Sequence, residues 1–167
     1  MKQYLRLLQN FHEKISHVLI LAAFVPVVMA MGGNAGIQSS TLVVRSLALG
    51  TINERNVLWI LVKEALSGAL MGVACGASIG VFSLILIWLN PEFSAKLPFH
   101  FLASILAIAL FCAITFAAVF GAIIPILLNQ IKIDPAVASG PFVTITNDIF
   151  ALLIYFTVTM LFIHPLN

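Results

Sequence analysis

The stretch PVVMAMGGNAGIQSSTLVVRSLALG, residues 26–50, decides the fold because it places polar residues inside an apolar run that could enter a membrane. Eight glycine, amide and hydroxyl residues interrupt the run: Gly32, Gly33, Asn34, Gly36, Gln38, Ser39, Ser40 and Thr41. Water is absent from the hydrocarbon core, so each polar group without a partner is costly there. We therefore expect this stretch to face protein or a hydrated path.

A helical register places four polar residues of this stretch on one face. They recur at i, i+4, i+7 and i+11 and form a polar stripe: Asn34, Gln38, Thr41 and Arg45. Such a stripe along an otherwise apolar helix is typical of a wall that faces an ion path. The helix itself is predicted over about residues 17–49, which exceeds the roughly 20 residues that cross a bilayer.

The composition is that of an integral membrane protein. Of the 167 residues, 62% are hydrophobic and 8% are charged, whereas about a quarter of the residues in soluble domains are charged. The net charge of +2 and the lack of a basic run argue against nucleic acid as a partner. Cys75 and Cys112 lie in apolar runs without metal-ligand spacing, so we expect small buried hydrophobic residues in preference to a disulfide or a metal pair.

The predicted fold class is an all-α integral membrane protein. An amphipathic interfacial segment over residues 1–14 precedes a bundle of four transmembrane helices within residues 15–167. The four spans are predicted over about residues 17–49, 58–89, 99–128 and 142–163. The second span carries glycines at every fourth position, which favours close helix association within or between chains: Gly68, Gly72, Gly76 and Gly80.

The connection before the last span contains two sequences that resemble helix starts. Asp134-Pro135 and Ser139-Gly140-Pro141 each place a capping side chain or a glycine ahead of a proline. If the helix instead continued through Pro141, the carbonyl of Val137 would lack its usual partner and would be free to face water or an ion.

Charge alone does not orient the chain. Four spans leave four Lys or Arg residues on each side, so the positive-inside rule is balanced. If the first fourteen residues are discounted, the rule places the connections around Arg55 and Lys132 in the cytoplasm. The four histidines lie at predicted span ends, where solvated imidazoles are ordinary.

Asp148 is the most informative single residue. It lies seven residues beyond Pro141, about 10 Å into the last span at ~1.5 Å per residue. Thr144 lies one turn earlier on the same face, and Thr146 and Asn147 accompany it. A carboxylate at such depth costs about 2.5–3.5 kcal/mol on insertion scales, so a functional site is the favoured interpretation. The alternative is an Asp148 that is protonated or hydrogen-bonded to a neighbouring helix.

Both polar segments resemble those of a known family. The run over residues 26–50 resembles the second transmembrane helix of the MgtE magnesium transporter and channel family, and IDPAVASGPFVTITNDIFALLIYF, residues 133–156, resembles its fifth. The resemblance extends over about residues 11–162 and implies a homodimer in the cell membrane with an ion path between its subunits. It implies Asp148 as the metal ligand and these pore-lining residues: Asn34, Gln38, Thr41, Thr144, Asn147, Gly33, Gly32 and Ala30.

Mg²⁺, as transported ion and pore ligand, suits these residue types. It gives up water reluctantly and prefers oxygen ligands, so a pore would hold it hydrated with one or two carboxylates. The two Asp148 carboxylates of a homodimer would repel each other without a cation, so protons would compete with the ion. An enzyme is not expected, because one deep ionisable residue supplies no acid and base pair.

The resemblance implies divalent cation transport through a channel-like pore and leaves two alternatives open. One is a magnesium transporter coupled to Na⁺ or H⁺, and the other is a non-transporting membrane subunit of a larger complex. Typical family members carry a cytoplasmic region with paired CBS domains, a plug helix and a further span ahead of the part matched here. We therefore expect either a separate regulatory chain as a partner or a shortened form whose regulation differs.

Overall fold

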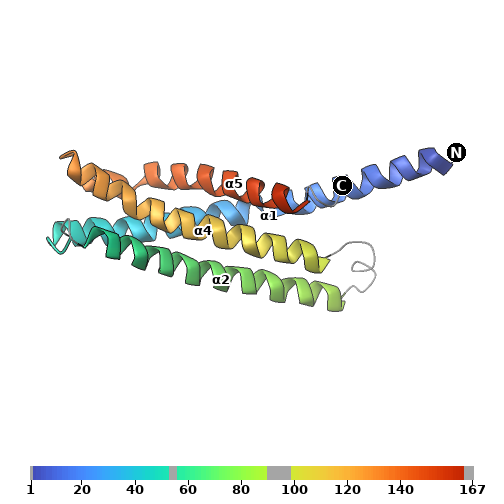
Figure 1. The fold of residues 1–167 in the computed structure, drawn as a ribbon, viewed down its shortest axis with the longest axis horizontal. Coiled ribbons are helices and arrows are strands. Elements are labelled where there is room, and N and C mark those ends of the chain that lie inside the picture. The colour runs from blue at the N-terminus through green and yellow to red at the C-terminus, as the bar shows by residue number, and fades with distance from the viewer. Residues whose placement is uncertain (1, 53–55, 90–98, 164–167) are drawn as a thin grey trace.

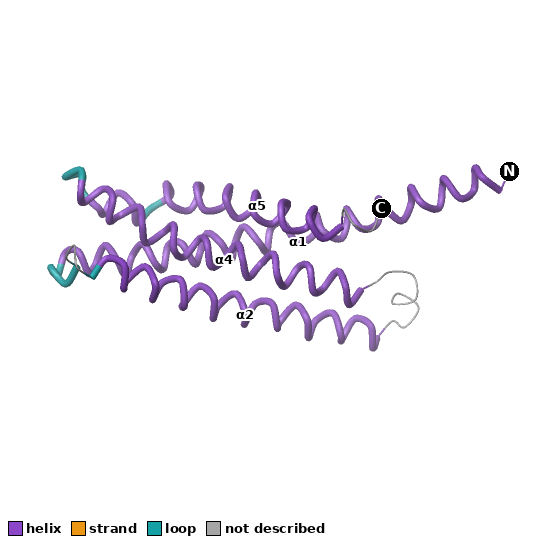
Figure 2. The backbone as a smooth tube through the Cα atoms, viewed as in Figure 1, coloured by secondary structure: helices purple, strands orange, loops and turns teal. Residues whose placement is uncertain are grey.

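The computed structural model describes residues 2–52, 56–89 and 99–163. Their regular structure is helical throughout and consists of these elements: α1 (Lys2–Ala48), α2 (Val57–Leu89), α4 (Phe99–Gln130), the 3₁₀ helix η1 (Pro135–Ser139) and α5 (Pro141–Ile163). The long helices run side by side as a bundle, and the N-terminal part of α1 continues beyond it (Figure 1). Figure 2 shows the turns on either side of η1, which connects α4 to α5.

Each long helix contains a stretch that is long and apolar enough to cross a membrane. The candidate spans are Phe24–Ala48, Val57–Phe82, Ala103–Gln130 and Pro141–Phe162. Large apolar side chains point away from the bundle, as at Leu70, which is 64% exposed. The predicted all-α class is confirmed, and the described residues contain four candidate membrane spans. The interfacial role of residues 1–14 stays a prediction, because their side chains lie outside the described residues.

Helix α4 is the centre of the bundle, since it packs against α1, α2, α5 and η1. Small side chains on α4 are fully buried, among them Ala109, Ala113 and Ala117. Small residues let membrane helices approach closely, and the larger side chains of the main core fill the space around them. That core includes Val28, Leu110, Ile114 and Tyr155.

The glycine face of α2 packs against α4 within the same chain. A Cβ atom at Gly68 would lie 2.8 Å from Ala118 Cβ, and one at Gly72 would lie 2.8 Å from Phe111 Cα. These distances are shorter than real Cβ contacts, so both positions require glycine. A Cβ at Gly80 would meet nothing within 4 Å in the described part of the chain. Close association is therefore confirmed for this face, and its partner is α4.

Replacing Gly72 with valine is expected to destabilise the bundle. The new side chain would overlap the backbone of α4 at Phe111, which no change of rotamer relieves, so we expect a loss of about 1–3 kcal/mol in the free energy of unfolding. The measurement is thermal unfolding of the purified protein in detergent. Gly80→Val is the matched control, and equal losses in the two variants would contradict this packing.

Both predicted helix starts are present before the last span. The Asp134 carboxylate accepts a hydrogen bond of 2.9 Å from the backbone N–H of Ala136, and Pro135 is the first residue of η1. Helix α5 begins at Pro141. Because the helix starts at this proline and does not pass through it, the condition for a free Val137 carbonyl is not met.

Candidate metal site

Helices α1 and α5 are antiparallel, and glycines of α1 form their interface. A Cβ at Gly32 would lie 2.6 Å from Ala151 Cβ, and a Cβ at Gly33 would lie 2.6 Å from Asp148 Oδ1. The same Cβ at Gly33 would lie 3.3 Å from Thr144 Cγ2. The structure therefore brings Asp148 and Thr144 together against the backbone of Gly33.

The Asp148 carboxylate is partly exposed at the side of the α1–α5 interface. Within the described ranges it has no hydrogen-bond or ion-pair partner. A structural Asp in a membrane span would be expected to bond to a neighbouring helix, because the hydrocarbon offers no water. Among the described residues, no such hydrogen bond to a neighbouring helix is observed for the Asp148 carboxylate.

The polar stripe of α1 lies on the surface of the single chain. Its four residues are all exposed, as is Ala30: Asn34, Gln38, Thr41 and Arg45. Asn34 directly follows Gly33, so the stripe begins beside the backbone that contacts Asp148. Gly32 and Gly33, in contrast, are buried at the interface with α5. The stripe and the Asp148 carboxylate are thus both accessible within the candidate spans, and the stripe begins at the residue after Gly33.

Asn147 lies elsewhere, in the interior of the bundle. Its side chain is fully buried, and neither Nδ2 nor Oδ1 has a hydrogen-bond partner in the part of the chain that the structure describes. A Cβ at Gly36 would overlap this amide, and a Cβ at Gly121 of α4 would overlap the Gly36 carbonyl. Leaving a buried polar group unpaired costs about 1–3 kcal/mol. Among the predicted pore-lining residues with polar side chains, Asn147 is thus the one whose side chain is fully buried.

Sequence reasoning missed a hydrogen bond between α1 and α2. The Ser39 hydroxyl donates to Glu64 Oε2 over 2.6 Å, and Ser39 is almost completely buried. A signal was available, since Glu64 lies four residues before Gly68 and so continues the glycine face of α2. Lys63, the residue before Glu64 in the chain, places Nζ 3.4 Å from the centre of the Trp59 ring, a cation–π contact.

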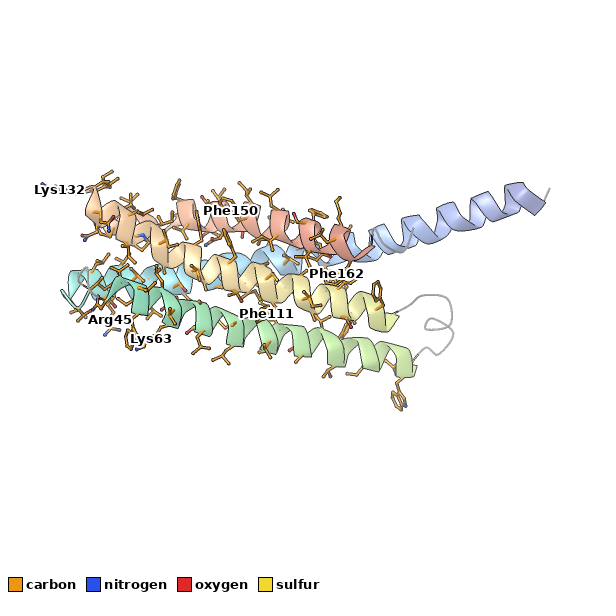
Figure 3. All side chains as sticks on the ribbon, in the orientation of Figure 1. Arg45, Lys63, Phe111, Lys132, Phe150 and Phe162 are labelled. Carbon is orange, nitrogen blue, oxygen red and sulfur yellow. The ribbon has the colours of Figure 1, made fainter. Side chains whose placement is uncertain are left out.

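Three basic side chains that the structure describes lie at the same end of the bundle. Figure 3 shows Arg45, Lys63 and Lys132 near that end, whereas Phe162 lies toward the other. Arg45 is also the last residue of the polar stripe, so the stripe runs from the middle of the bundle toward the charged end. This arrangement agrees with the predicted topology, in which the connections after the first and third spans share a side.

One chain supplies few metal ligands. Among the described residues, no group of three or more His, Cys, Asp or Glu side chains could hold a metal ion. Cys75 and Cys112 are free thiols, as expected, and are partly buried. The side chains of all four histidines lie outside the described residues. A cation at Asp148 would therefore need oxygen ligands from water, the backbone, neutral side chains or a second copy of the chain.

The chain resembles known membrane transporters over almost its whole length. Residues 25–158 match the model of the MgtE family, described as a divalent cation transporter. The chain is 36% identical over 160 residues to the magnesium transporter MgtE of Bacillus subtilis (strain 168). It is 34% identical over 158 residues to that of Enterococcus faecalis and 32% identical over 158 residues to that of Thermus thermophilus.

These matches cover 95–96% of this chain but 33% of each relative. The chain therefore spans about one third of the length of these relatives, and the matched region contains the α1–α5 interface with Gly33 and Asp148. The family is one of transporters and not of enzymes, which confirms the expectation drawn from the single deep carboxylate. On the extent of the family match and the identities to three relatives, the chain belongs to the MgtE family of divalent cation transporters.

Proposed function

We propose that this chain forms a path for Mg²⁺ across the membrane as a homodimer, with Asp148 as the metal-binding carboxylate. The observation that carries the proposal is the placement of Asp148. It lies within a membrane span, partly exposed and unpaired among the described residues, against the backbone of Gly33. A carboxylate so placed is costly unless a cation neutralises it, which favours an ion site over a structural role.

A second copy of the chain explains the exposed polar stripe. Asn34, Gln38 and Thr41 would face hydrocarbon if the chain were alone in the membrane, which gives them no partners. A two-fold axis beside the α1–α5 interface would bring two stripes and two Asp148 carboxylates to face each other. Amide and hydroxyl oxygens would then line a polar path that ends near the two Arg45 side chains.

The ligand chemistry favours a hydrated divalent cation at this site. Mg²⁺ holds its waters strongly and is usually bound by one or two carboxylates, with water completing an octahedron. Two Asp148 side chains supply that number, and Thr144 adds a hydroxyl on the same face. A non-transporting subunit would not require this carboxylate, so the unpaired Asp148 favours transport over that alternative.

Cysteine cross-linking tests the dimer. In a variant without Cys75 and Cys112, Gln38→Cys is expected to form a disulfide between two chains in membranes, because the proposed axis brings the two stripes together. Gel electrophoresis without reductant measures the dimer. Leu70→Cys, on the apolar outer face of α2, is the control and should remain monomeric. Cross-linking through position 70 and not through position 38 would contradict the proposed interface.

The coupled-transporter alternative predicts a different dependence on gradients. A channel-like path conducts Mg²⁺ down its own gradient when Na⁺ and pH are equal on both sides of the membrane. A coupled transporter requires one of those gradients for Mg²⁺ to accumulate against its own. Mg²⁺ flux into liposomes, measured with and without an imposed Na⁺ or pH gradient, separates the two mechanisms.

A further inference from the structure

The Asn147 carboxamide is a buried polar group of the bundle that the proposed path does not use. It is fully enclosed, and neither of its polar atoms has a hydrogen-bond partner within the described residues. Other buried polar side chains differ in this respect. Ser39 donates to Glu64, and Thr159 donates to the carbonyls of Tyr155 and Phe156. Asn147 is therefore held in a position that its chemistry disfavours.

The surroundings of this amide consist largely of backbone. Its Nδ2 occupies the space that a Cβ at Gly36 would need, and the Ala117 carbonyl oxygen lies 3.3 Å from that same point. A Cβ at Gly121 would overlap the Gly36 carbonyl, so α1 and α4 touch beside the amide. Helix backbone does not rearrange as a side chain does. A movement of α5 relative to α1 and α4 would therefore give the amide access to new partners.

The α1–α5 interface is suited to such a movement. On the α1 side, Gly32 and Gly33 present no side chain that would interlock with α5, and they face Ala151 and Asp148. Successive residues of an α-helix are about 100° apart around the axis. If α5 rotates about its axis so that Asp148 moves from Gly33 toward the exposed stripe, Asn147 moves with it. Asn147 then approaches the position beside Gly33 that Asp148 has left.

We propose that Asn147 is a positioning residue for the transported cation. Its amide is held without partners while Asp148 lies against Gly33, and it gains partners at the polar surface when a divalent cation draws Asp148 toward the stripe. The inference rests on the proposed function of Asp148. Relief of the unpaired amide then adds to the free energy of cation binding, because the cation binds better to the turned state of α5.

Two variants remove the amide with opposite changes in volume. Asn147→Leu replaces the amide beside Gly36 with a larger apolar side chain, whereas Asn147→Ala replaces it with a smaller one. For both we expect the Mg²⁺ concentration at half-saturation to rise about tenfold, equivalent to about 1.4 kcal/mol. The measurement is the thermal unfolding midpoint of the full chain in detergent, titrated with MgCl₂. Thr159→Val is the control on α5, since Thr159 is buried with its hydrogen bonds made, and its half-saturation should equal that of the wild type.

The outcomes separate this inference from the proposed function. If both Asn147 variants keep the wild-type Mg²⁺ concentration at half-saturation, the positioning role is overturned. A rise of that concentration in one variant alone would also overturn it, because an effect of packing depends on the side-chain volume. If the leucine variant does not fold, the alanine variant decides alone. A wild-type protein without any Mg²⁺-dependent shift would overturn the site at Asp148 as well. A shift that Asp148→Ala abolishes but the Asn147 variants leave unchanged refutes only the role of Asn147.

Discussion

Cells that depend on this chain for magnesium are expected to lose uptake almost completely when Asp148 is replaced by alanine. The variant removes the carboxylate that lies within the last candidate span, and no group of three or more His, Cys, Asp or Glu side chains among the described residues could hold the metal in its place. Asp148→Asn keeps the shape of the side chain and removes the charge, so it should be similarly inactive. A hydrated divalent cation in a low-dielectric site requires anionic ligands, and neutral oxygens alone supply too little stabilisation.

The effect at Asp148 is expected on transport and not on the fold. The carboxylate makes no hydrogen bond among the described residues, so its loss breaks no contact, and removal of an unpaired carboxylate from the span should leave stability unchanged or higher. Mg²⁺-dependent growth of cells without their own magnesium uptake measures the first effect, and thermal unfolding in detergent measures the second. Full uptake by a stably folded Asp148→Ala variant would contradict the assignment of this site.

A single methyl group at Gly33 is expected to impair transport at least about tenfold. In Gly33→Ala the new Cβ would lie 2.6 Å from Asp148 Oδ1, so the carboxylate must leave its place. The end of a side chain moves easily, so the bundle itself should persist with little loss of stability. The cation ligand is displaced by roughly an ångström, and ion sites tolerate such displacement poorly.

Gly32→Ala is the matched comparison because it is the preceding residue of the same interface. Its Cβ would lie 2.6 Å from Ala151 Cβ, which can move only with the backbone of α5. We expect this variant to lose about 1–3 kcal/mol of stability, whereas Gly33→Ala loses transport at near-normal stability. Uptake and thermal unfolding, measured on both variants, give the contrast. The reverse pattern would show that the methyl group at position 33 acts through helix packing.

The sequence was sufficient to predict the candidate spans, the shared face of the polar stripe and the position of Asp148 within the last span, because apolar runs and stripes are periodic and a carboxylate in an apolar run is costly. Asn34 and Gln38 share a face in any helix, and a carboxylate in an apolar span is conspicuous wherever it packs. Both proline-marked helix starts were also predictable, since Asp134 and Pro141 act locally. The stripe is observed on one exposed face, as its spacing requires.

Which helix opposes which face was not predictable for this chain. Lipid chains and the protein interior are both apolar, so the sequence does not distinguish a leucine that faces lipid from one in the core. Leu70 of α2 is 64% exposed, for example, whereas Leu110 of α4 is 1% exposed. The glycine face of α2 could not be assigned to α4 for the same reason. Asn147 was grouped with Asp148 because the two are adjacent in the chain, yet adjacency turns them about 100° apart. The packing of Asn147 between Gly36 of α1 and Ala117 of α4 gives the amide its separate environment.

Mg²⁺ flux into liposomes that contain only this purified chain tests the central claim most directly. Wild type and Asp148→Ala are compared with Mg²⁺ outside, and with equal Na⁺ and equal pH on the two sides. The account predicts downhill flux through the wild-type protein and flux no greater than that of empty liposomes in the variant. Equal flux through the two proteins, or no flux through a correctly inserted wild type, would contradict a path that this chain builds around Asp148.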